Sequence, residues 1–275
     1  MNLSIKALVA GALIAAPILI PSVPAEAGVG DLLVAPTRLV LNGGRGAEVI
    51  LNNIGDEPAT YRISVEFRRM KPDGTLDEVA EPSEAEKLAR DMIVYAPRRV
   101  TLAPNEPQSV RISARPPQGL PDGEYRIHML FRAVPPATPV AKTTGEPPKG
   151  LSFKLTPVYG VTIPVIVRLG NLEAKAGIAN VRLDRRDGKP VVALDLTRSG
   201  DRSTFGEVRV LKPGVKDPIG SQRAVAVYTE IGTRQVVVPI DEAFKGELSG
   251  PVTVQYLETY DDGAKTIAET QAVLR

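Results

Sequence analysis

Apolar side chains occupy every second position between residues 151 and 167, in the segment LSFKLTPVYGVTIPVIV. Because a β-strand turns successive side chains to opposite faces, this alternation predicts a strand with one continuous apolar face. A run of this length would reach roughly 55 Å at about 3.3 Å per residue, whereas strands in globular proteins usually have about 5–6 residues. We therefore expect part of this face to project beyond its own core or to lie along a sheet edge, where a foreign strand can pair with it.

Two plainer interpretations of the same run stay open. It could be one long strand that bridges two domains, or two short strands broken at Pro157 and Gly160, because proline and glycine both interrupt β-ladders. The segment before it, residues 135–150 (PPATPVAKTTGEPPKG), is rich in Pro, Gly and Thr, and we expect it to be a mobile loop that leads into the run.

Short strand-like segments separated by turn signals fill the rest of the chain. About seven of them lie between residues 30 and 167, a number and spacing typical of an immunoglobulin-like sandwich. A second block of strand-like segments begins after Arg168 and Gly170. The sequence therefore predicts an all-β fold with two immunoglobulin-like β-sandwich domains in series, residues 28–168 and 169–275, joined by a very short linker that fixes their angle and creates a cleft.

One short helix is expected, from Ser83 to Arg90. Ser83 is a suitable N-cap residue, and Glu86 stands three positions later, as in a capping box. The segment is short and polar, so we expect one or two turns of helix within a loop.

The first residues have the pattern of a secretory signal peptide covering residues 1–27. Lys6 precedes an apolar stretch from Ala7 to about Ile20, and Ala25-Glu26-Ala27 forms an A-x-A cleavage pattern. No later stretch reaches the roughly 18 consecutive apolar residues of a membrane helix. We therefore expect an exported chain of about 250 residues that is not inserted in a membrane.

Composition narrows the classes of function. The chain has no cysteine, which excludes disulfides and zinc–thiolate sites, so its cores must hold the fold. Its 34 basic and 32 acidic residues give a net charge of +2, which argues against nucleic acid as a partner. It has no tryptophan and only 4% aromatic residues, which argues against a carbohydrate-stacking platform.

Catalytic chemistry has few candidate residues. His128 is the single histidine, and its place in a strand-like segment favours a structural role. Asp261 and Asp262 precede Gly263, which indicates a turn, and Asp184 and Asp187 flank another turn without the ligand spacing of a calcium loop. We expect no enzymatic activity, no cofactor and no metal.

Three blocks of the first domain resemble those of the PapD-like periplasmic chaperones that assemble fimbriae. The first is PTRLVL followed by AEVILNNIGDEPATYRISV, the second is APRRVTLAPNEPQSVRI, and the third is LPDGEYRIHMLFRAVPP. Asn105 stands where the family usually has glycine. The second domain is similar only in size and strand character.

This resemblance implies a periplasmic chaperone that binds pilin or fimbrial subunits by donor-strand complementation and delivers them to an outer-membrane usher, which it meets through the complex. In the family, the chaperone fills the groove of an incomplete immunoglobulin fold with alternating side chains of its own strand. By comparison, the donor residues here are Leu151, Phe153, Leu155, Pro157 and Tyr159, whereas residues 161–167 return to the chaperone's own core. Whether the free protein also self-associates through this strand stays open.

The resemblance also implies a basic anchor for the subunit's C-terminal carboxylate. Arg38 stands at the first of the family's two basic positions, and a guanidinium can grip a carboxylate with two hydrogen bonds. Pro164 stands where the second basic residue, a lysine, is expected. Either the grip is weaker here, or Arg168 or Lys154 substitutes, or the cargo is bound differently.

Glu124 and Arg168 fall on positions where the family forms interdomain ion pairs with an aspartate of the second domain, for which Asp261 or Asp262 is the candidate. Such pairs would hold the cleft angle more than they would add stability. A different class of function also stays open, namely a secreted structural or adhesive β-sandwich of a surface fibre.

Overall fold

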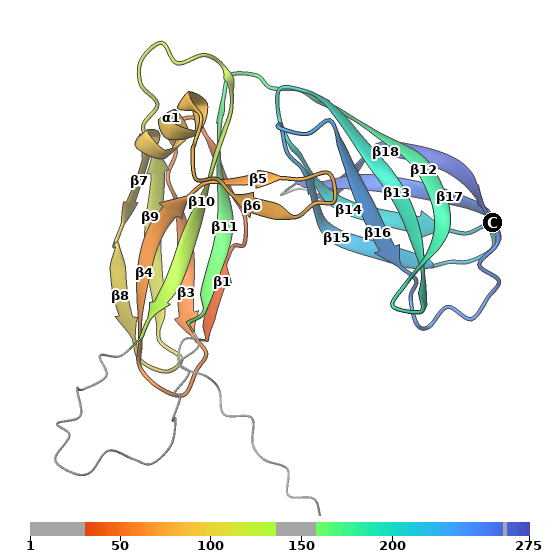
Figure 1. Cartoon of the computed structure of the whole chain (residues 1–275), viewed down its shortest axis with the longest axis horizontal. Helices are drawn as coiled ribbons and strands as arrows, with labels where there is room; N and C mark the ends of the chain where they lie inside the picture. Colours follow the sequence, from red (N-terminus) through yellow and green to blue (C-terminus); the bar gives the residue numbers. More distant parts are fainter. Residues whose placement is uncertain (1–30, 136–157, 261–262) are drawn as a thin grey trace, which may run out of the picture.

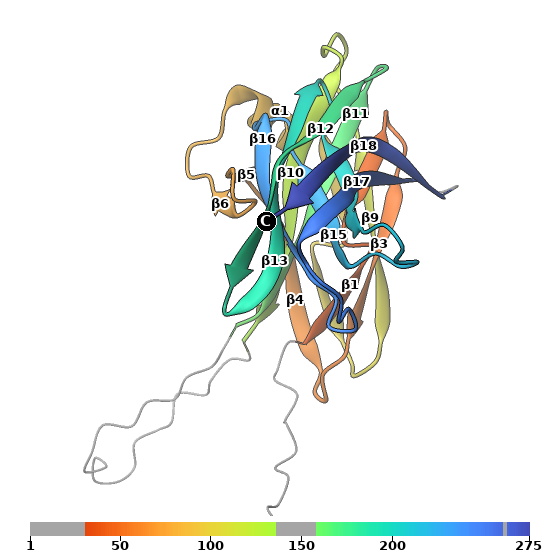
Figure 2. The ribbon, with the colours of Figure 1, turned by 90° about the vertical axis from the view of Figure 1, so that its right-hand side faces the viewer.

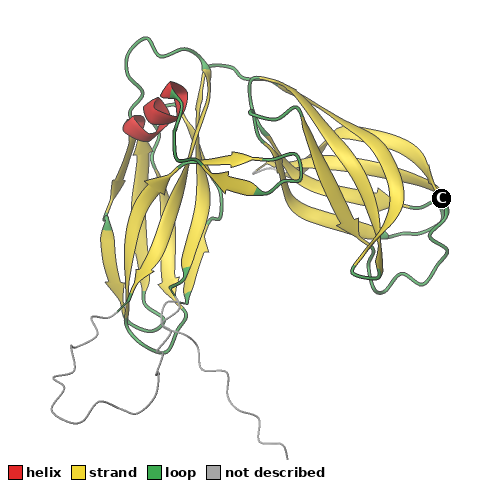
Figure 3. Cartoon of the chain, viewed as in Figure 1, coloured by secondary structure: helices red, strands yellow, loops and turns green. Residues whose placement is uncertain are grey.

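The computed structural model describes residues 31–135, 158–260 and 263–275, apart from the side chain of Tyr260. Two β-sandwiches follow one another along the chain, and their long axes are inclined to each other (Figure 1). The predicted all-β fold with two immunoglobulin-like domains in series is confirmed, with a single short helix among the described residues. Figure 3 shows that this helix caps one end of the first sandwich. None of the described helical segments is long and apolar enough to cross a membrane.

The first domain packs a four-stranded sheet on a five-stranded sheet. The four-stranded sheet has the order β1-β3-β9-β7, formed by Leu32–Ala35, Ala47–Asn53, Pro107–Ala114 and Ile93–Ala96. The five-stranded sheet has the order β2-β11-β10-β4-β8, formed by Leu39–Asn42, Gly160–Leu169, Gly123–Val134, Ala59–Glu66 and Arg99–Leu102. Alternate residues of these strands point inward and close a core around Tyr61 and Phe131, both fully buried.

The second domain packs a three-stranded sheet on a four-stranded sheet. The three-stranded sheet has the order β12-β13-β16, formed by Ala174–Arg186, Lys189–Gly200 and Thr233–Pro239. The other has the order β15-β14-β17-β18, formed by Gly220–Val227, Thr204–Leu211, Gly250–Tyr260 and Gly263–Leu274. Its core is built mainly of valines around Tyr256, whose buried hydroxyl donates a hydrogen bond of 2.9 Å to the carbonyl oxygen of Val225.

Strand β11 supplies the second half of the alternating run. Ile163, Val165 and Val167 are at most 1% exposed and lie in the first core, as their period of two predicts. The described strand begins at Gly160. Residues 136–157, which contain most of the expected loop and the first part of the expected strand, lie outside the described residues.

A hairpin and a helix are inserted between β4 and β7. The hairpin consists of β5 (Arg68–Met70) and β6 (Leu76–Glu78), and its turn is at Pro72-Asp73-Gly74, where the sequence carries a turn signal. It projects from the first sandwich to the second (Figure 1), and in Figure 2 it lies beside β16. Gly74 has φ +85°, and a Cβ atom there would overlap the guanidinium of Arg234 in the second domain. Glycine suits this position because it adopts the positive φ without strain, and because it leaves room for the guanidinium of Arg234.

Helix α1 spans Glu84–Met92 and extends slightly past the expected end. The capping box forms as its sequence predicts: the hydroxyl of Ser83 accepts a hydrogen bond from the backbone N–H of Glu86, and the Glu86 carboxylate accepts one of 2.7 Å from the N–H of Ser83. Ala89 and Met92 are buried against the sandwich. Glu86 also accepts two hydrogen bonds from Arg69 in β5, at 2.8 and 2.6 Å, so the helix holds the base of the hairpin.

The Arg69–Glu86 contact predicts an acid-sensitive part of the stability. Hydrogen bonds from Arg69 lower the pKa of Glu86 to about 2, with burial opposing and Ser83 adding to the effect. The pKa of glutamate in an unfolded chain is about 4.3. The contribution of the Arg69–Glu86 contact to the unfolding free energy is therefore complete above that pH and is lost as the pH falls towards 2. We expect Glu86→Gln to lower the unfolding free energy by about 1–2 kcal/mol at pH 7, and by progressively less below pH 4.

Urea unfolding between pH 7 and pH 2.5 measures this difference. Glu84→Gln is the matched control, because the Glu84 side chain lies on the same helical turn but is 85% exposed and forms a surface ion pair with Lys87. Its substitution should change the unfolding free energy by a few tenths of a kcal/mol at most. Parallel pH profiles for Glu86→Gln and the wild type would contradict the prediction.

Candidate functional site

Strand β11 has one edge that is only partly paired. It pairs with β10 along its whole length, whereas β2 covers its other edge only from Val165 to Arg168. The N–H of Ala133 donates to the carbonyl oxygen of Tyr159 at 2.9 Å. This hydrogen bond shows which residues of β11 direct their backbone N–H and C=O groups towards β10. The backbone groups of odd-numbered residues therefore face β10, and those of Gly160, Thr162 and Pro164 face the other edge. From Gly160 to Pro164 this edge has no partner strand among the described residues.

Pro164 limits a ladder along this edge. Its nitrogen faces away from β10 and carries no hydrogen, so the proline leaves the β10 pairing intact. An added strand can exchange hydrogen bonds with Gly160 and Thr162, but it receives no N–H from Pro164, and beyond that residue β2 occupies the edge. The free edge is therefore the N-terminal half of β11.

The apolar face leaves the domain core at the start of this edge. Val161 is partly buried, whereas Tyr159 is 51% exposed. Tyr159 is the only expected donor residue within the described part of the chain; Leu151, Phe153, Leu155 and Pro157 lie outside it. The contacts of these four side chains stay a prediction from the sequence.

Arg38 lies where the first strand of the chain changes sheets. β1 pairs with β3 in one sheet, β2 pairs with β11 in the other, and Arg38 directly precedes β2. Its Nη2 donates to the hydroxyl of Ser203 at 3.2 Å, and its guanidinium carbon lies 4.6 Å from the ring centroid of Phe205. Burial lowers the pKa of Arg38 from its ordinary value. Arg38 thus faces the second domain, and its Nη1 is buried without a hydrogen-bond partner among the described residues.

Glu124 and Arg168 lie opposite each other on β10 and β11 and form an ion pair of 3.0 Å. Ser203 of the second domain completes the contact: its N–H donates to Glu124 Oε2 at 3.0 Å, and its carbonyl oxygen accepts from Arg168 Nη2 at 3.2 Å. Asp261 and Asp262, the expected partners in the second domain, lie outside the described residues. The sequence does not identify Ser203 as a junction residue, because its contacts with Glu124 and Arg168 use the backbone N–H and C=O that almost every residue has.

The β5–β6 hairpin adds a second set of interdomain contacts. Arg126 of β10 donates two hydrogen bonds to Glu230 of the second domain, at 2.9 and 2.5 Å, and Glu230 also accepts the N–H of Met70 at 2.8 Å. Burial of Glu230 favours the protonated acid, but Arg126 outweighs it and holds the pKa of Glu230 below its ordinary value. The N–H of Gln235 donates to the carbonyl oxygen of Pro72 at 2.6 Å.

An apolar cluster, which we call the junction cluster, fills the space between these polar contacts. It combines residues of both domains and the hairpin: Met70, Leu76, Ile166, Phe205, Ala226, Tyr228 and Ile231. Ile166 points away from the first core, yet it is fully buried because the second domain covers this face of the sheet. The junction around Arg38 is therefore closed by the chain's own side chains.

Tyr228 is the centre of the charged part of the junction. The guanidinium carbon of Arg126 lies 3.7 Å from its ring centroid, and that of Arg38 lies 5.7 Å away. His128 meets the same ring edge-on, with centroids 6.4 Å apart. Burial, followed by the charges of Arg126, Arg68 and Arg38, lowers the pKa of His128 to about 3. His128 is therefore neutral near pH 7, and it packs against the ring of Tyr228.

Pro164, at the position of the missing second basic residue, is the cross-strand neighbour of His128. On β10 and β11, Arg126 is paired with Glu230, and Arg168 is paired with Glu124. Lys154 lies outside the described residues. The described part of the chain contains no group of three or more His, Cys, Asp or Glu residues arranged to hold a metal ion.

No protein-family model matches the chain, and no curated protein matches its sequence. Solved structures do match it. The E. coli chaperone DraB is 16% identical, with 89% of this chain and 97% of that chain covered and a TM-score of 0.46. The pre-assembly complex of the chaperone CsuC with the tip subunit CsuE, from the archaic chaperone-usher Csu pili of Acinetobacter baumannii, gives 12% identity, 89% and 98% coverage and a TM-score of 0.45.

The complex of the Salmonella enterica SafA pilin with the SafB chaperone is a further match. It gives 18% identity, 89% coverage of this chain, 96% coverage of that chain and a TM-score of 0.44. These three matches cover 89% of the chain at 12–18% identity.

Proposed function

We propose that this protein is a non-enzymatic periplasmic chaperone that binds pilus or fimbrial subunits by donor-strand complementation and delivers them for assembly at the outer membrane. The observation that carries the proposal is the free edge of β11 from Gly160 to Pro164. There the apolar face leaves the chaperone's core at Tyr159, and the same alternation continues in the sequence back to Leu151.

The energetics of such an edge suit reversible binding. Three apolar side chains buried in a subunit's groove would contribute about 1.5–3 kcal/mol each. Backbone hydrogen bonds to Gly160 and Thr162 would join the two chains into one sheet and set their register. Ile163, Val165 and Val167 are buried in the core and fix the C-terminal end of the donor segment. This reduces the conformational entropy that the segment would lose on binding.

Donation through the sequence-predicted face is tested with a double substitution. Phe153→Asp combined with Leu155→Asp should abolish co-purification of the subunit from a periplasmic extract, because charged side chains cannot enter an apolar groove. Ser152→Asp combined with Thr156→Asp is the matched control, since it places the same charges on the opposite face and should keep more than half of the yield. Mass spectrometry identifies the subunit, and size-exclusion chromatography measures the stoichiometry.

Both variants should retain the circular dichroism spectrum of the wild type. Wild-type yield of the complex with the Phe153/Leu155 variant would exclude strand donation through this face. A soluble one-to-one complex supports a chaperone, whereas polymers of the purified chain alone would favour the subunit of a fibre.

We further propose that Arg38 anchors the subunit's terminal carboxylate. Its Nη1 is the donor that has no partner within the described chain, but it lies under Phe205 and Tyr228. A carboxylate can reach it only when these rings move aside, so anchoring would be coupled to a shift of the second domain.

Arg38→Ala should weaken subunit binding by about 10-fold to 150-fold, which corresponds to about 1.5–3 kcal/mol for a charge-assisted hydrogen bond. Arg99→Ala is the control, because Arg99 is exposed on β8 and forms no part of the junction. Surface plasmon resonance with the purified subunit measures both. Equal dissociation constants for Arg38→Ala and the wild type would remove the anchor assignment and leave strand donation standing.

A further inference from the structure

Arg62 and Arg132, which we call the arginine pair, place two like charges together on the outer face of the five-stranded sheet. They are direct cross-strand partners on β4 and β10, and both side chains are exposed. Neither side chain forms a hydrogen bond or an ion pair with a described residue. Like charges that lie directly opposite each other destabilise an antiparallel pair of strands. The first domain therefore gains no stability from this arrangement.

The surroundings of the arginine pair supply no free carboxylate among the described residues. The nearest acid on the same face of β4 is Glu66, whose carboxylate already accepts hydrogen bonds from Arg68 at 2.6 Å and from Thr162 Oγ1 at 2.8 Å. On the other side of Arg62, its partner on β8 is Arg99, a further positive charge. Residues 136–157 contain three lysines and one glutamate, so the sequence brings no excess of negative charge there.

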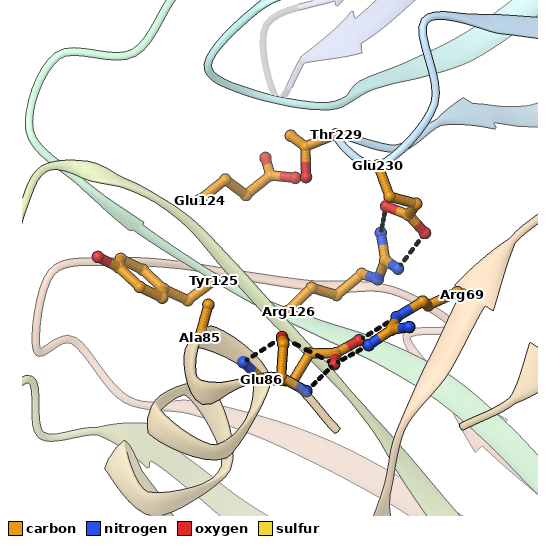
Figure 4. A pocket seen from close by; sticks show the side chains of 9 residues that line it. Arg69, Ala85, Glu86, Glu124, Tyr125, Arg126, Thr229 and Glu230 are labelled. Atoms are coloured by element: carbon orange, nitrogen blue, oxygen red, sulfur yellow. Dashed lines mark hydrogen bonds and ion pairs between the residues drawn. The ribbon is translucent and has the colours of Figure 1, made fainter. Parts of the chain in front are cut away.

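The arginines that face the cavity between the domains are a contrast. Arg69 donates two hydrogen bonds to Glu86, and Arg126 donates two to Glu230, as Figure 4 shows. Each of these guanidiniums holds a carboxylate with two N–H groups, the geometry that arginine favours. The arginine pair lacks such a partner.

A hollow of about 270 Å³ lies beside the arginine pair. No carboxylate lines it, and its other walls are apolar or backbone; the full lining is Arg62, Arg132, Ala133, Val134, Pro135 and Val158. Val158 lies directly before β11, so the hollow is next to the start of the free edge.

Arg132 lies one strand away from the free edge, because β4, β10 and β11 are neighbours in the sheet (Figure 1). Its cross-strand neighbour on β11 is Gly160, whose backbone groups face that edge. Gly160 has no side chain that would separate Arg132 from a strand added there. Such a strand would lie two strand spacings from β10, roughly 10 Å, which an arginine and a glutamate side chain can span together.

We propose that the arginine pair binds an acidic side chain of the partner strand, an aspartate or a glutamate at the outer-face position beside Gly160. This inference rests on the proposed function, because the acid belongs to the strand that pairs with the free edge of β11. In it, apolar side chains and backbone hydrogen bonds provide most of the affinity, and the arginine pair selects the partner and its register. A second copy of this chain does not fit, because its residues 151–164 contain Lys154 and no acid.

Peptide binding to the full-length protein tests the chemistry of the site. The probe is a blocked seven-residue peptide in which glutamate alternates with threonine, and its neutral counterpart has glutamine in place of glutamate. In an NMR titration at pH 7 and low ionic strength, we expect saturable binding of the glutamate peptide, at least fivefold tighter than that of the glutamine peptide. Equal affinities for the two peptides would overturn the proposal. Inorganic phosphate that binds as tightly as the glutamate peptide would also overturn it, in favour of an unspecific anion site.

Arg62→Gln combined with Arg132→Gln should reduce the affinity for the glutamate peptide to that for the glutamine peptide. Arg45→Gln combined with Arg115→Gln is the matched control, because it removes two exposed charges of the same domain that do not line the hollow. The control should keep the affinity within twofold. The same loss in both variants would show a general effect of net charge and would contradict the proposal.

Thermal unfolding of the free protein gives an independent measurement. The Arg62/Arg132 variant should unfold at the same temperature as the wild type or slightly higher, because the substitutions remove like charges that face each other. A lower unfolding temperature would reveal a partner within the chain and would overturn the proposal.

The purified subunit separates this proposal from strand donation. We expect the Arg62/Arg132 variant to bind the subunit at least fivefold more weakly in surface plasmon resonance, and still to form the one-to-one complex. Wild-type affinity of this variant would overturn the role of the arginine pair and leave strand donation standing. Binding of the glutamate peptide does not use Phe153 or Leu155, so it can succeed where strand donation fails.

Discussion

Strand β11 is buried on both faces over its C-terminal half, and the arrangement of the two domains depends on this. Ile163, Val165 and Val167 face the first core, whereas Ile166, on the opposite face, is covered by the second domain. Because neighbouring side chains of a strand point in opposite directions, packing of the odd-numbered residues in the first core turns the even-numbered residues towards the second domain. A shift of one residue in the β10–β11 register would exchange the two sets and would separate Glu124 from Arg168.

The junction is held by unlike interactions that reinforce one another. The junction cluster removes apolar surface from water and lowers the local dielectric, which strengthens the Arg126–Glu230 and Glu124–Arg168 contacts beside it. The chain has no disulfide, so these contacts and the two cores must provide the whole of the rigidity. The β5–β6 hairpin is important here, because its backbone forms hydrogen bonds with the second domain at Met70 and Pro72.

The same packing separates two regions that the proposed function would use. The N-terminal half of β11 has an edge without a partner strand among the described residues, and the half-exposed Tyr159 lies directly before it, so the proposed partner strand would pair with this edge without disturbing the described sheets. Arg38 is instead covered by Phe205 and Tyr228 of the second domain. A binding mechanism that uses both regions therefore begins at the edge and involves the junction only when the second domain moves.

The sequence alone determined the features that depend on short-range pattern. Alternation of apolar residues predicted strands and two sandwiches, Ser83 and Glu86 predicted a helix start with its capping box, and Pro72-Asp73-Gly74 carried a turn signal. Likewise, the period of two placed the odd-numbered residues 163–167 on one face, and the resemblance to a family assigned this part of the run to a core. The pairing of Glu124 with Arg168 came from resemblance to a family, because the two residues are 44 positions apart and no local pattern links them.

Only the tertiary structure decided what meets at the junction. Nothing near Arg126 in the sequence identifies Glu230, which is 104 positions away, and nothing marks Ser203 as the residue that contacts both Arg38 and Glu124. The period of two does not assign the even-numbered Ile166 to a core, because its burial depends on a domain that lies later in the chain. Periodicity reports which face of an element is buried, whereas contacts between domains depend on the angle at which two finished surfaces meet, and no periodic signal encodes that angle.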